Sequence, residues 1–300
     1  MLSEGYLRRH IQMLRSDREH ALLDVAQEYI LEDLRRKGIF DLVVFKGGTA
    51  LRKFIFGVEG RLSVDLDFAL RDPDPGVADL VFDALREASF SDVRVQIEGL
   101  KNATADLTVE TPRGITTLAR VSVRRQLPWL PIQLRDPKPF LPLDQGLEFQ
   151  RSPLPIIDLR EIAAEKLAAF SRRRHARDLY DLEHLGRLLV PRVNFADIAE
   201  LAALKIYFDV VEERLPHPID AIANLFDENR SIAGVEDLGL LRASTTDPKA
   251  LLVKCASRYS ALGAMDDELV KLVANPSRRD LPPVMRRRGN VVARLTSSTG

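Results

Sequence analysis

Residues 43–70 read VVFKGGTALRKFIFGVEGRLSVDLDFAL and contain two features that indicate the fold. One apolar run ends at Gly47 and Gly48, and a second contains Asp65 and Asp67, one residue apart. The pattern predicts buried strands over 41–46 and 62–70, with a short helix over 49–57 directly behind the two glycines. The first question is why two like charges stand on one strand.

The two aspartates are expected to share a face of their strand with Ser63, because side chains alternate along a strand. Two carboxylates so close together repel each other and raise each other's pKa. An exposed polar edge strand explains the pair without any chemistry. The alternative is a divalent cation, since Mg²⁺ prefers oxygen ligands and completes its shell with water and phosphate. Two such ions can hold the attacking and leaving oxygens of a nucleotidyl transfer.

The glycines lack a Cβ, so the backbone at Gly47 and Gly48 can turn sharply and an anion can approach its N–H groups. Thr49 either caps the following helix or offers its hydroxyl to a phosphate. A tight strand-to-helix turn explains a lone Gly-Gly-Thr equally well. Combined with the aspartate strand, the turn is more specific: one part would hold a triphosphate and the other the metals that bridge it.

The rest of the first half of the chain mixes strands and helices. A helix is expected over 17–37, where apolar residues recur at helical spacing and stop at Gly38, and another over 75–88. Strands are expected over 93–97, 105–110 and 116–123. Seven prolines between residues 124 and 155 argue against a long helix and indicate an irregular connection.

Helical patterns dominate the second half, over 158–173, 175–189, 195–212, 217–227 and roughly 247–274. The final segment carries six arginines after residue 276 and is expected to be poorly ordered. The predicted division is N-terminal helices (1–40), an α/β or α+β core (41–155), a helical domain (156–275) and a basic flexible tail (276–300).

Composition excludes several classes of protein. The formal net charge of zero argues against a general polyanion binder, although it leaves room for a local basic surface. The single cysteine, Cys255, excludes an internal disulfide and a multi-cysteine zinc site, and it is expected in the core. No apolar run approaches the ~20 residues of a membrane span, and the N-terminus is unlike a signal peptide. A cytoplasmic location is the expectation.

A second informative segment is LREIAAEKLAAFSRRRHARDLYDLEHL, residues 159–185. Lys166 falls within the apolar stripe of the predicted helix. It either snorkels from the edge of the stripe or directs its cation into a cleft, where it would meet phosphate. Arg177 and Asp181 are four residues apart and can pair on a helix surface, which needs no function.

These segments together resemble a known family. The Gly-Gly-Thr turn, the helix and the Asp65-x-Asp67 strand are similar to the core of polymerase-β-type nucleotidyltransferases. The sequence resembles the AbiEii-type nucleotidyltransferases in the segments FKGGTALRK and SVDLDF, which are followed by Lys166 and ARDLYDL (176–182). Those proteins are the toxin half of bacterial toxin–antitoxin pairs and include mycobacterial tRNA-modifying toxins. The order of elements agrees over roughly 40–190 and implies a mixed sheet followed by a helical C-terminal domain.

The resemblance also implies roles for individual residues. Asp65 and Asp67 would hold one or two Mg²⁺ ions, Lys166 would contact the phosphates of a nucleoside triphosphate, and Asp181, or else Asp178, would be an essential acid near the metal. The candidate phosphate-binding residues in and near the turn are Gly47, Gly48, Thr49 and Ser63. Ser63 is alternatively a modification site. The candidates for RNA contact or for support of the site are Lys46, Arg174, Arg177 and Asp178.

The implied reaction is attack of an acceptor hydroxyl on the α-phosphorus, with pyrophosphate leaving. The implied acceptor is the 3′ end of tRNA, and a cognate antitoxin is expected to be encoded nearby, with no membrane partner. The basic cluster Arg172–Arg174 is the best candidate for contact with a phosphate backbone. Other readings are transfer to a small molecule such as an aminoglycoside, transfer to a protein hydroxyl, or a nucleotide-binding regulator without turnover.

The sequence departs from the polymerase-β-type pattern at one point. Such sites usually take a third metal-binding carboxylate from a later strand, and the expected strand, TTLARVSVRR (116–125), contains no acid. Asp106 and Glu110 on the preceding strand, or Asp181 from the helical half, are the alternatives that stay open.

Overall fold

The computed structural model describes residues 4–14, 16–74, 76–86, 88–90, 93–110, 116–189, 193–218, 222–234 and 247–297. The chain divides into two compact units, Met1–Pro128 with Ile132–Ile157, and Trp129–Pro131 with Asp158–Gly300. This division agrees with a change from mixed structure to helices near residue 157. The finer division into four parts stays a prediction.

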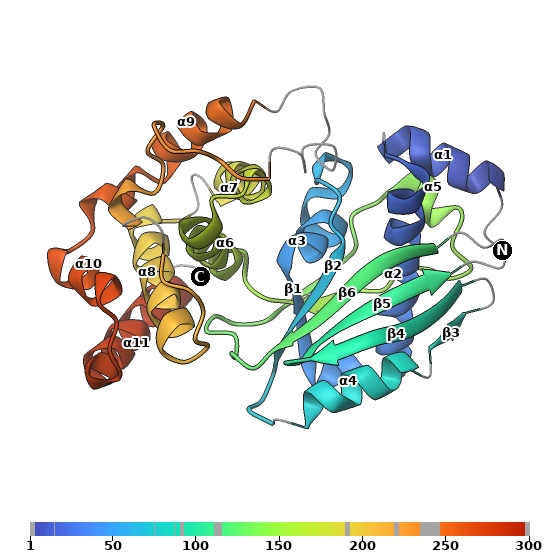
Figure 1. Cartoon of the computed structure of the whole chain (residues 1–300), viewed down its shortest axis with the longest axis horizontal. Coiled ribbons are helices and arrows are strands. Elements are labelled where there is room, and N and C mark those ends of the chain that lie inside the picture. Colours follow the sequence, from blue (N-terminus) through green and yellow to red (C-terminus); the bar gives the residue numbers. More distant parts are fainter. Residues whose placement is uncertain are drawn as a thin grey trace. The chain divides into compact units, whose positions relative to one another are not determined.

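The first unit is built on one mixed sheet, with eight strands among the described residues in the order β3-β4-β5-β6-β2-β1-β8-β7. Figure 1 labels strands β1 to β6 of this sheet. Strand β2 runs antiparallel to β1 on one side and parallel to β6 on the other. The strands are β1 (Val43–Lys46), β2 (Asp65–Leu70), β3 (Ser89–Phe90), β4 (Val93–Lys101), β5 (Thr104–Glu110), β6 (Thr116–Arg124), β7 (Gln133–Arg135) and β8 (Leu154–Ile156).

Helices α2 and α4 pack against this sheet and against each other (Figure 1). Helix α2 begins after Asp17, whose side chain accepts a hydrogen bond from the His20 backbone at 2.8 Å, and it ends before Gly38, whose φ is +72°. Both ends agree with the predicted helix. The helices of this unit are α1 (Glu4–Leu14), α2 (Arg18–Arg36), α3 (Gly47–Ala50), α4 (Val77–Arg86) and α5 (Leu141–Asp144).

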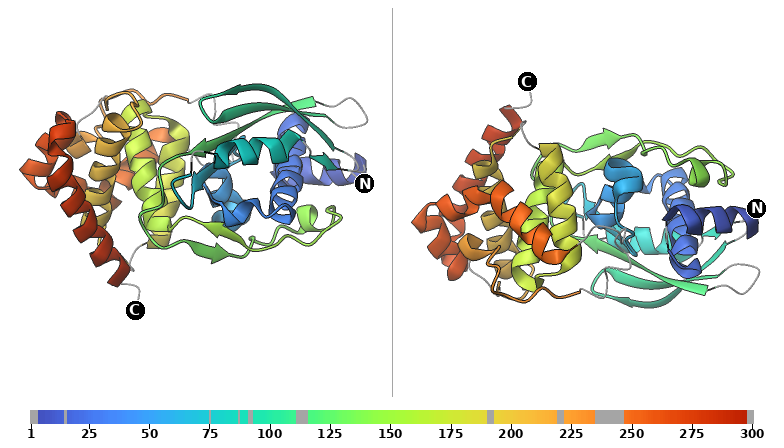
Figure 2. Two further views of the ribbon diagram at one scale, coloured as in Figure 1. Left: turned by 90° about the horizontal axis from the view of Figure 1, so that it is seen from below. Right: turned by 90° about the horizontal axis from the view of Figure 1, so that it is seen from above.

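The second unit is helical in its described part. Helix α8 packs against α6, α10 and α11, and α7 packs against α6 and α9 (Figure 2). The helices are α6 (Leu159–Arg173), α7 (Ala176–Leu189), α8 (Phe195–Val211), α9 (Pro248–Arg258), α10 (Asp267–Ala274) and α11 (Leu281–Ser297). Cys255 of α9 is buried, as predicted. No helix in the described ranges is long and apolar enough to cross a membrane.

Trp129–Pro131 belongs to this helical unit through a buried glutamate. The backbone N–H groups of Trp129 and Leu130 donate to the carboxylate of Glu161 at 2.9 and 2.8 Å. Lys205 of α8 lies 2.6 Å from the same carboxylate and 4.3 Å from the centre of the Trp129 ring. Two backbone donors and one cation therefore satisfy a charge that would be costly to bury alone.

Two predicted helices of the second half were wrong in extent. The described part of 217–227 contains only a 3₁₀ turn, Ile222–Asn224, and residues 219–221 lie outside the described residues. The predicted helix over 247–274 is two helices, α9 and α10, separated by a 3₁₀ segment, Ser260–Ala264. The apolar spacing continues across that break, which is why periodicity alone did not show it.

The expectation of a poorly ordered tail was also wrong, because α11 occupies most of it. Val284, Val291 and Leu295 are buried and form an apolar stripe at helical spacing. Arginines stand on the other sides of the helix, where Arg287 lies 2.5 Å from Asp266 and Arg294 lies 2.7 Å from Asp197. The segment is therefore an amphipathic helix, and two of its arginines, Arg287 and Arg294, form ion pairs. Residues 298–300 lie outside the described part.

Candidate active site

The glycine turn and the aspartate strand meet at one end of β2. Gly47 has a φ of +80°, and a Cβ built on it would overlap the carboxylate of Asp67 and lie 3.1 Å from the Asp67 Cβ. A Cβ on Gly48 would lie 2.8 Å from the Ser63 hydroxyl and 2.5 Å from the Arg61 guanidinium. Both glycines are therefore needed so that the turn can lie against side chains of the following segment.

Thr49 ties the turn to β2. Its side chain is buried, and its hydroxyl donates a hydrogen bond to the backbone carbonyl of Asp65 at 2.5 Å. Helix α3 begins at Gly47, with Lys46 at the N-cap position and no capping side chain. Of the two alternatives for Thr49, capping of the helix is therefore wrong. Thr49 lies inside the first turn, and its hydroxyl is used within the protein.

The alternation expected for β2 is present. Asp65 and Asp67 are half-buried, whereas Leu66 and Phe68 between and beyond them are fully buried. The two carboxylates therefore share the more open face of the strand. Ser63 precedes the strand, since β2 begins at Asp65.

The strand register places further polar residues beside the two carboxylates. Across the sheet Asp67 is paired with Lys46 of β1 on one side and with Ser122 of β6 on the other. Asp65 is paired with Arg120 of β6, which in turn is paired with Asp106 of β5. Paired residues on neighbouring strands point to the same face of a sheet. Two rows of polar residues therefore cross β2.

Strand β6 supplies a hydroxyl where a third carboxylate was expected. Ser122 is 8% exposed, and its Oγ donates to Asp67 Oδ1 at 2.6 Å. The alternative ligands on β5 do not join the pair: Asp106 Oδ1 lies 2.8 Å from Arg120 Nε, and Glu110 is four residues, or about 13 Å, farther along the strand. In the described part of the chain no group of three or more His, Cys, Asp or Glu residues is arranged to hold a metal ion.

The donors that are present fit Mg²⁺ with few protein ligands. Asp65 and Asp67 offer carboxylate oxygens on the open face of β2, and Mg²⁺ keeps several waters and takes substrate phosphates in addition to one or two carboxylates. The missing Cβ of Gly47 is what makes room for the Asp67 carboxylate. Asp65 and Asp67 are thus the residues that would hold the ion.

Arg120 adds a positive charge to this face. Its guanidinium is 58% exposed. The hydrogen bond to Asp106, the charge of Asp106 and the charge of Asp65 raise the pKa of Arg120 above its usual value. The side chain therefore remains cationic at any pH at which the protein is folded.

In the helical unit, Lys166 of α6 forms buried ion pairs with α7. Its Nζ lies 2.7 Å from Asp181 Oδ2 and 3.3 Å from Asp178 Oδ1, and both aspartates are 1% exposed or less. These partners explain a lysine in an apolar stripe. The expected pair between Arg177 and Asp181 does not form, and Arg177 Nε is buried without a hydrogen-bond partner among the described residues.

The basic cluster Arg172–Arg174 is neutralised inside this unit. Arg172 lies 2.5 Å from Asp209, and Arg173 lies 2.7 Å from Asp178. Arg174 is 4% exposed and has a φ of +47°. Its guanidinium donates to the backbone carbonyls of Leu225, Asp227 and Ser231 at 2.7, 3.0 and 3.1 Å. Of the two roles expected of Arg174, contact with RNA or support of the site, this burial favours support.

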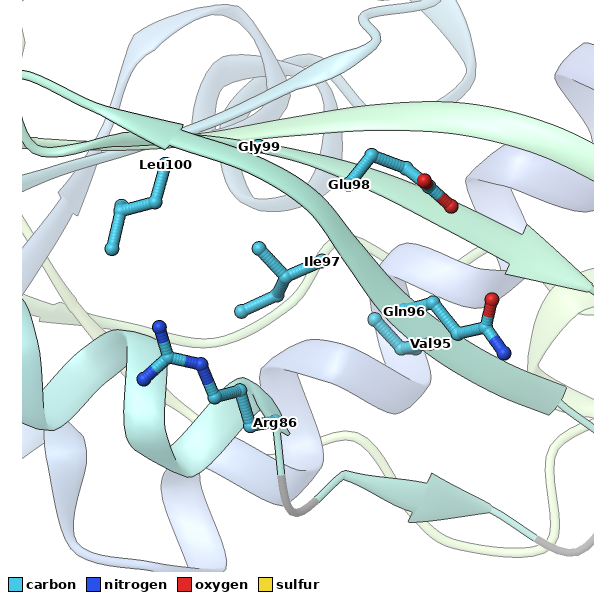
Figure 3. A pocket seen from close by; sticks show the side chains of 7 residues that line it. All are labelled: Arg86, Val95, Gln96, Ile97, Glu98, Gly99 and Leu100. Carbon is cyan, nitrogen blue, oxygen red and sulfur yellow. The ribbon is translucent and has the colours of Figure 1, made fainter.

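A pocket of about 490 Å³ lies elsewhere on the first unit. Figure 3 shows the side chains of Arg86, Ile97 and Leu100 directed toward one space. In the register, Ile97 and Leu100 are paired with the buried residues Leu107 and Ala105. The pocket therefore opens on the face of the sheet opposite the carboxylates. It is lined by Arg86, Val95, Gln96, Ile97, Glu98, Gly99 and Leu100.

Comparison with known proteins identifies the family of the chain. Residues 29–232 match the family described as "Nucleotidyl transferase AbiEii toxin, Type IV TA system". The chain belongs to the AbiEii nucleotidyltransferase toxin family. The AbiEii-type resemblance seen in the sequence is thereby confirmed. As an AbiEii toxin, the protein is a nucleotidyltransferase of a toxin–antitoxin system, and membership implies a cognate antitoxin.

A solved structure of another protein shows the same fold. The chain is similar to MenT4, a nucleotidyltransferase toxin from Mycobacterium tuberculosis H37Rv, with 27% sequence identity and a TM-score of 0.84 over 97% of this chain and 99% of that one. JHP933 from Helicobacter pylori matches with 19% identity over 95% of this chain and 99% of that one, with a TM-score of 0.43 that is too low to support a common fold. No curated protein matches the sequence. The MenT4 likeness confirms the predicted fold class, a mixed sheet with a helical C-terminal region.

Two residues of the carboxylate face of this AbiEii toxin, Arg120 and Ser122, were not predicted from the sequence. Residues 116–125 contain no acid, so the strand had no predicted role in the site. The signal that was present is the alternation Arg120, Ser122, Arg124, which places three polar side chains on one face of β6. Their position opposite Asp65 and Asp67 depends on the register between strands about 50 residues apart, which the sequence does not show.

Proposed function

We propose that this AbiEii toxin transfers a nucleotide from a nucleoside triphosphate to RNA, specifically to the 3′ end of tRNA, in a Mg²⁺-dependent reaction that blocks translation. The observation that carries the proposal is the pair Asp65 and Asp67, held between the glycine turn and Ser122. The AbiEii-type resemblance to tRNA-modifying toxins supports RNA as the acceptor.

In the proposed reaction the backbone N–H groups of the Gly47–Thr49 turn bind the triphosphate, as a helix N-terminus binds anions. Asp65 and Asp67 would hold Mg²⁺, which would supply positive charge to neutralise the phosphates. The acceptor hydroxyl attacks the α-phosphorus and loses its proton, the bond to the bridging oxygen breaks, and pyrophosphate leaves. Positioning and charge neutralisation are the protein's main contributions.

Lys166 and Asp181 are proposed to be required for the same reaction. Lys166 is a cation suited to phosphate, and its pairing with Asp181 at 2.7 Å fixes where its ammonium group lies. Asp178 holds both Lys166 and Arg173 and thus supports the arrangement. In this proposal Asp181 positions Lys166.

The experiment combines purified protein, Mg²⁺, each labelled nucleoside triphosphate separately, and total bacterial RNA. The expected product is labelled tRNA with one preferred nucleotide. Asp65→Ala, Lys166→Ala and Asp181→Ala should each abolish labelling, whereas Asp79→Asn, a change at an exposed aspartate of α4, should not. Label on protein or on a small molecule instead of RNA would contradict the acceptor.

The biological setting is part of the proposal. We infer that the toxin acts in the cytoplasm, where its tRNA acceptor is found, and that its antitoxin is encoded beside it. Expression without the antitoxin should arrest growth, and Asp65→Ala should relieve the arrest at equal protein level.

A further inference from the structure

Strand β6 presents two arginines next to the carboxylate pair. Arg120 and Arg124 occupy alternate positions with Ser122 between them, so all three lie on the face that carries Asp65 and Asp67. Arg120 is paired with Asp65 in the register, and neighbouring strands are about 4.8 Å apart. A row of cations therefore runs along the strand directly beside the carboxylates.

Both guanidinium groups retain donors for a ligand. Arg120 uses Nε for Asp106, and its two terminal nitrogens make no hydrogen bond with the described residues. Arg124 is exposed and makes no ion pair with the part of the chain that the structure describes. In contrast, acceptors within the protein bind the guanidinium groups of Arg172, Arg173 and Arg174. An anion beside Asp65 and Asp67 would thus find available arginine donors on β6.

The order of the strands assigns this row to the acceptor. Strand β2 lies between β1 and β6, and the glycine turn follows β1. A triphosphate on the turn therefore occupies the β1 side of Asp65 and Asp67. In phosphoryl transfer the attacking and leaving oxygens are roughly in line with the phosphorus. In the proposed reaction pyrophosphate leaves on the side of the turn, so the acceptor approaches from the side of β6.

A further side chain on this face is suited to a nucleic acid. Leu118 precedes Arg120 by two residues on the same face of β6 and is 70% exposed. A large apolar side chain beside a basic row can contact the bases while the arginines contact the backbone. Asp106 accepts from Arg120 Nε and so orients the guanidinium without covering its terminal nitrogens.

We propose that the β6 row, Arg120 and Arg124 with Leu118, is the binding site for phosphodiester groups of the acceptor RNA. The proposal rests on the proposed RNA acceptor. Arg120 holds the phosphate nearest the reacting hydroxyl, and Arg124 holds a second one about 13 Å along the strand. Asp106 is a positioning residue for Arg120.

The test measures binding of fluorescently labelled tRNA and, separately, of a nucleoside triphosphate, without turnover. Arg120→Ala and Arg124→Ala should each weaken tRNA binding about tenfold, with nucleotide affinity unchanged. Each should also reduce, by about one, the slope of the logarithm of the tRNA binding constant against the logarithm of the salt concentration. Arg120→Lys should recover much of the binding because it keeps the charge. Arg94→Ala is the matched control, since Arg94 is exposed on the same face but lies opposite Glu110 in the strand register, at the far end of β5.

The outcomes separate this inference from the proposed function. Wild-type protein that labels RNA, together with arginine variants that bind tRNA normally, would overturn the β6 site alone. A loss confined to nucleotide binding would overturn it as well and would assign Arg120 to the triphosphate. Wild-type protein that neither binds nor labels RNA would overturn both proposals.

Discussion

The backbone of Gly47 lies directly against the carboxylate of Asp67, so that a Cβ on the glycine would overlap it. This contact joins the glycine turn, Gly47 and Gly48, to strand β2, which carries Asp65 and Asp67. It also means that a small change in the turn moves a group proposed to hold Mg²⁺.

Gly47→Ala should remove most nucleotidyl transfer, by at least about tenfold, because the new methyl group displaces Asp67. It should also cost about 1–2 kcal/mol of unfolding free energy, since φ is +80°. The matched control is Gly38→Ala, where φ is +72° but the nearest atom would lie at 3.7 Å. The control should lose similar stability and keep its activity, and equal activity losses in both variants would refute this explanation.

Ser122→Ala should raise the Mg²⁺ concentration needed for half-maximal rate about fivefold, because Asp67 loses the hydrogen bond that orients it. Calorimetric titration of the nucleotide-free protein with Mg²⁺ should show the same weakening. Ser122→Thr keeps the hydroxyl and should behave like wild type. An unchanged Mg²⁺ requirement in Ser122→Ala would show that the bond has no such role.

Lys166→Met should lower the free energy of unfolding by about 3 kcal/mol, because Asp181 is left charged and buried. Urea denaturation measures this loss. The double variant Lys166→Met with Asp181→Asn should regain part of the stability, since Asp178 keeps Arg173 as a partner, and remain inactive. Recovery of activity in the stable double variant would show that Lys166 serves only the fold.

Arg174→Ala should destabilise the helical unit by about 2–3 kcal/mol, because three backbone carbonyls lose a charged donor. The melting temperature should fall while tRNA affinity at a temperature where the protein is folded stays the same. The opposite result, weaker tRNA binding with unchanged melting, would restore Arg174 as an RNA contact.

Local patterns in the sequence predicted the parts of the site that depend on one element or on neighbouring ones. The alternation along β2 and the turn at Gly47 were predictable in this way, as was α2 between Asp17 and Gly38. The partner of Lys166 was not, because Asp181 lies near it only when α6 packs on α7. The residues opposite Asp65 were hidden for a similar reason, since a register between parallel strands has no local signature.

The structure also differs from the expectations for Arg172–Arg174 and for the C-terminal segment, because contacts between distant segments are absent from local sequence patterns. Arg172–Arg174 stands out as a basic cluster in one dimension, but each guanidinium finds acceptors from distant segments once the helices pack. The arginine-rich tail suggested disorder because its buried residues, such as Val284 and Val291, are few and widely spaced. In both cases tertiary contacts decided the role of the charges.

Transfer of a labelled nucleotide to tRNA by wild-type protein and by Asp65→Asn tests the proposed reaction, because asparagine keeps the size of the side chain and removes its charge. Wild-type protein should label tRNA in the presence of Mg²⁺, and the folded variant should give no label above background. Equal labelling by Asp65→Asn would contradict the proposed reaction.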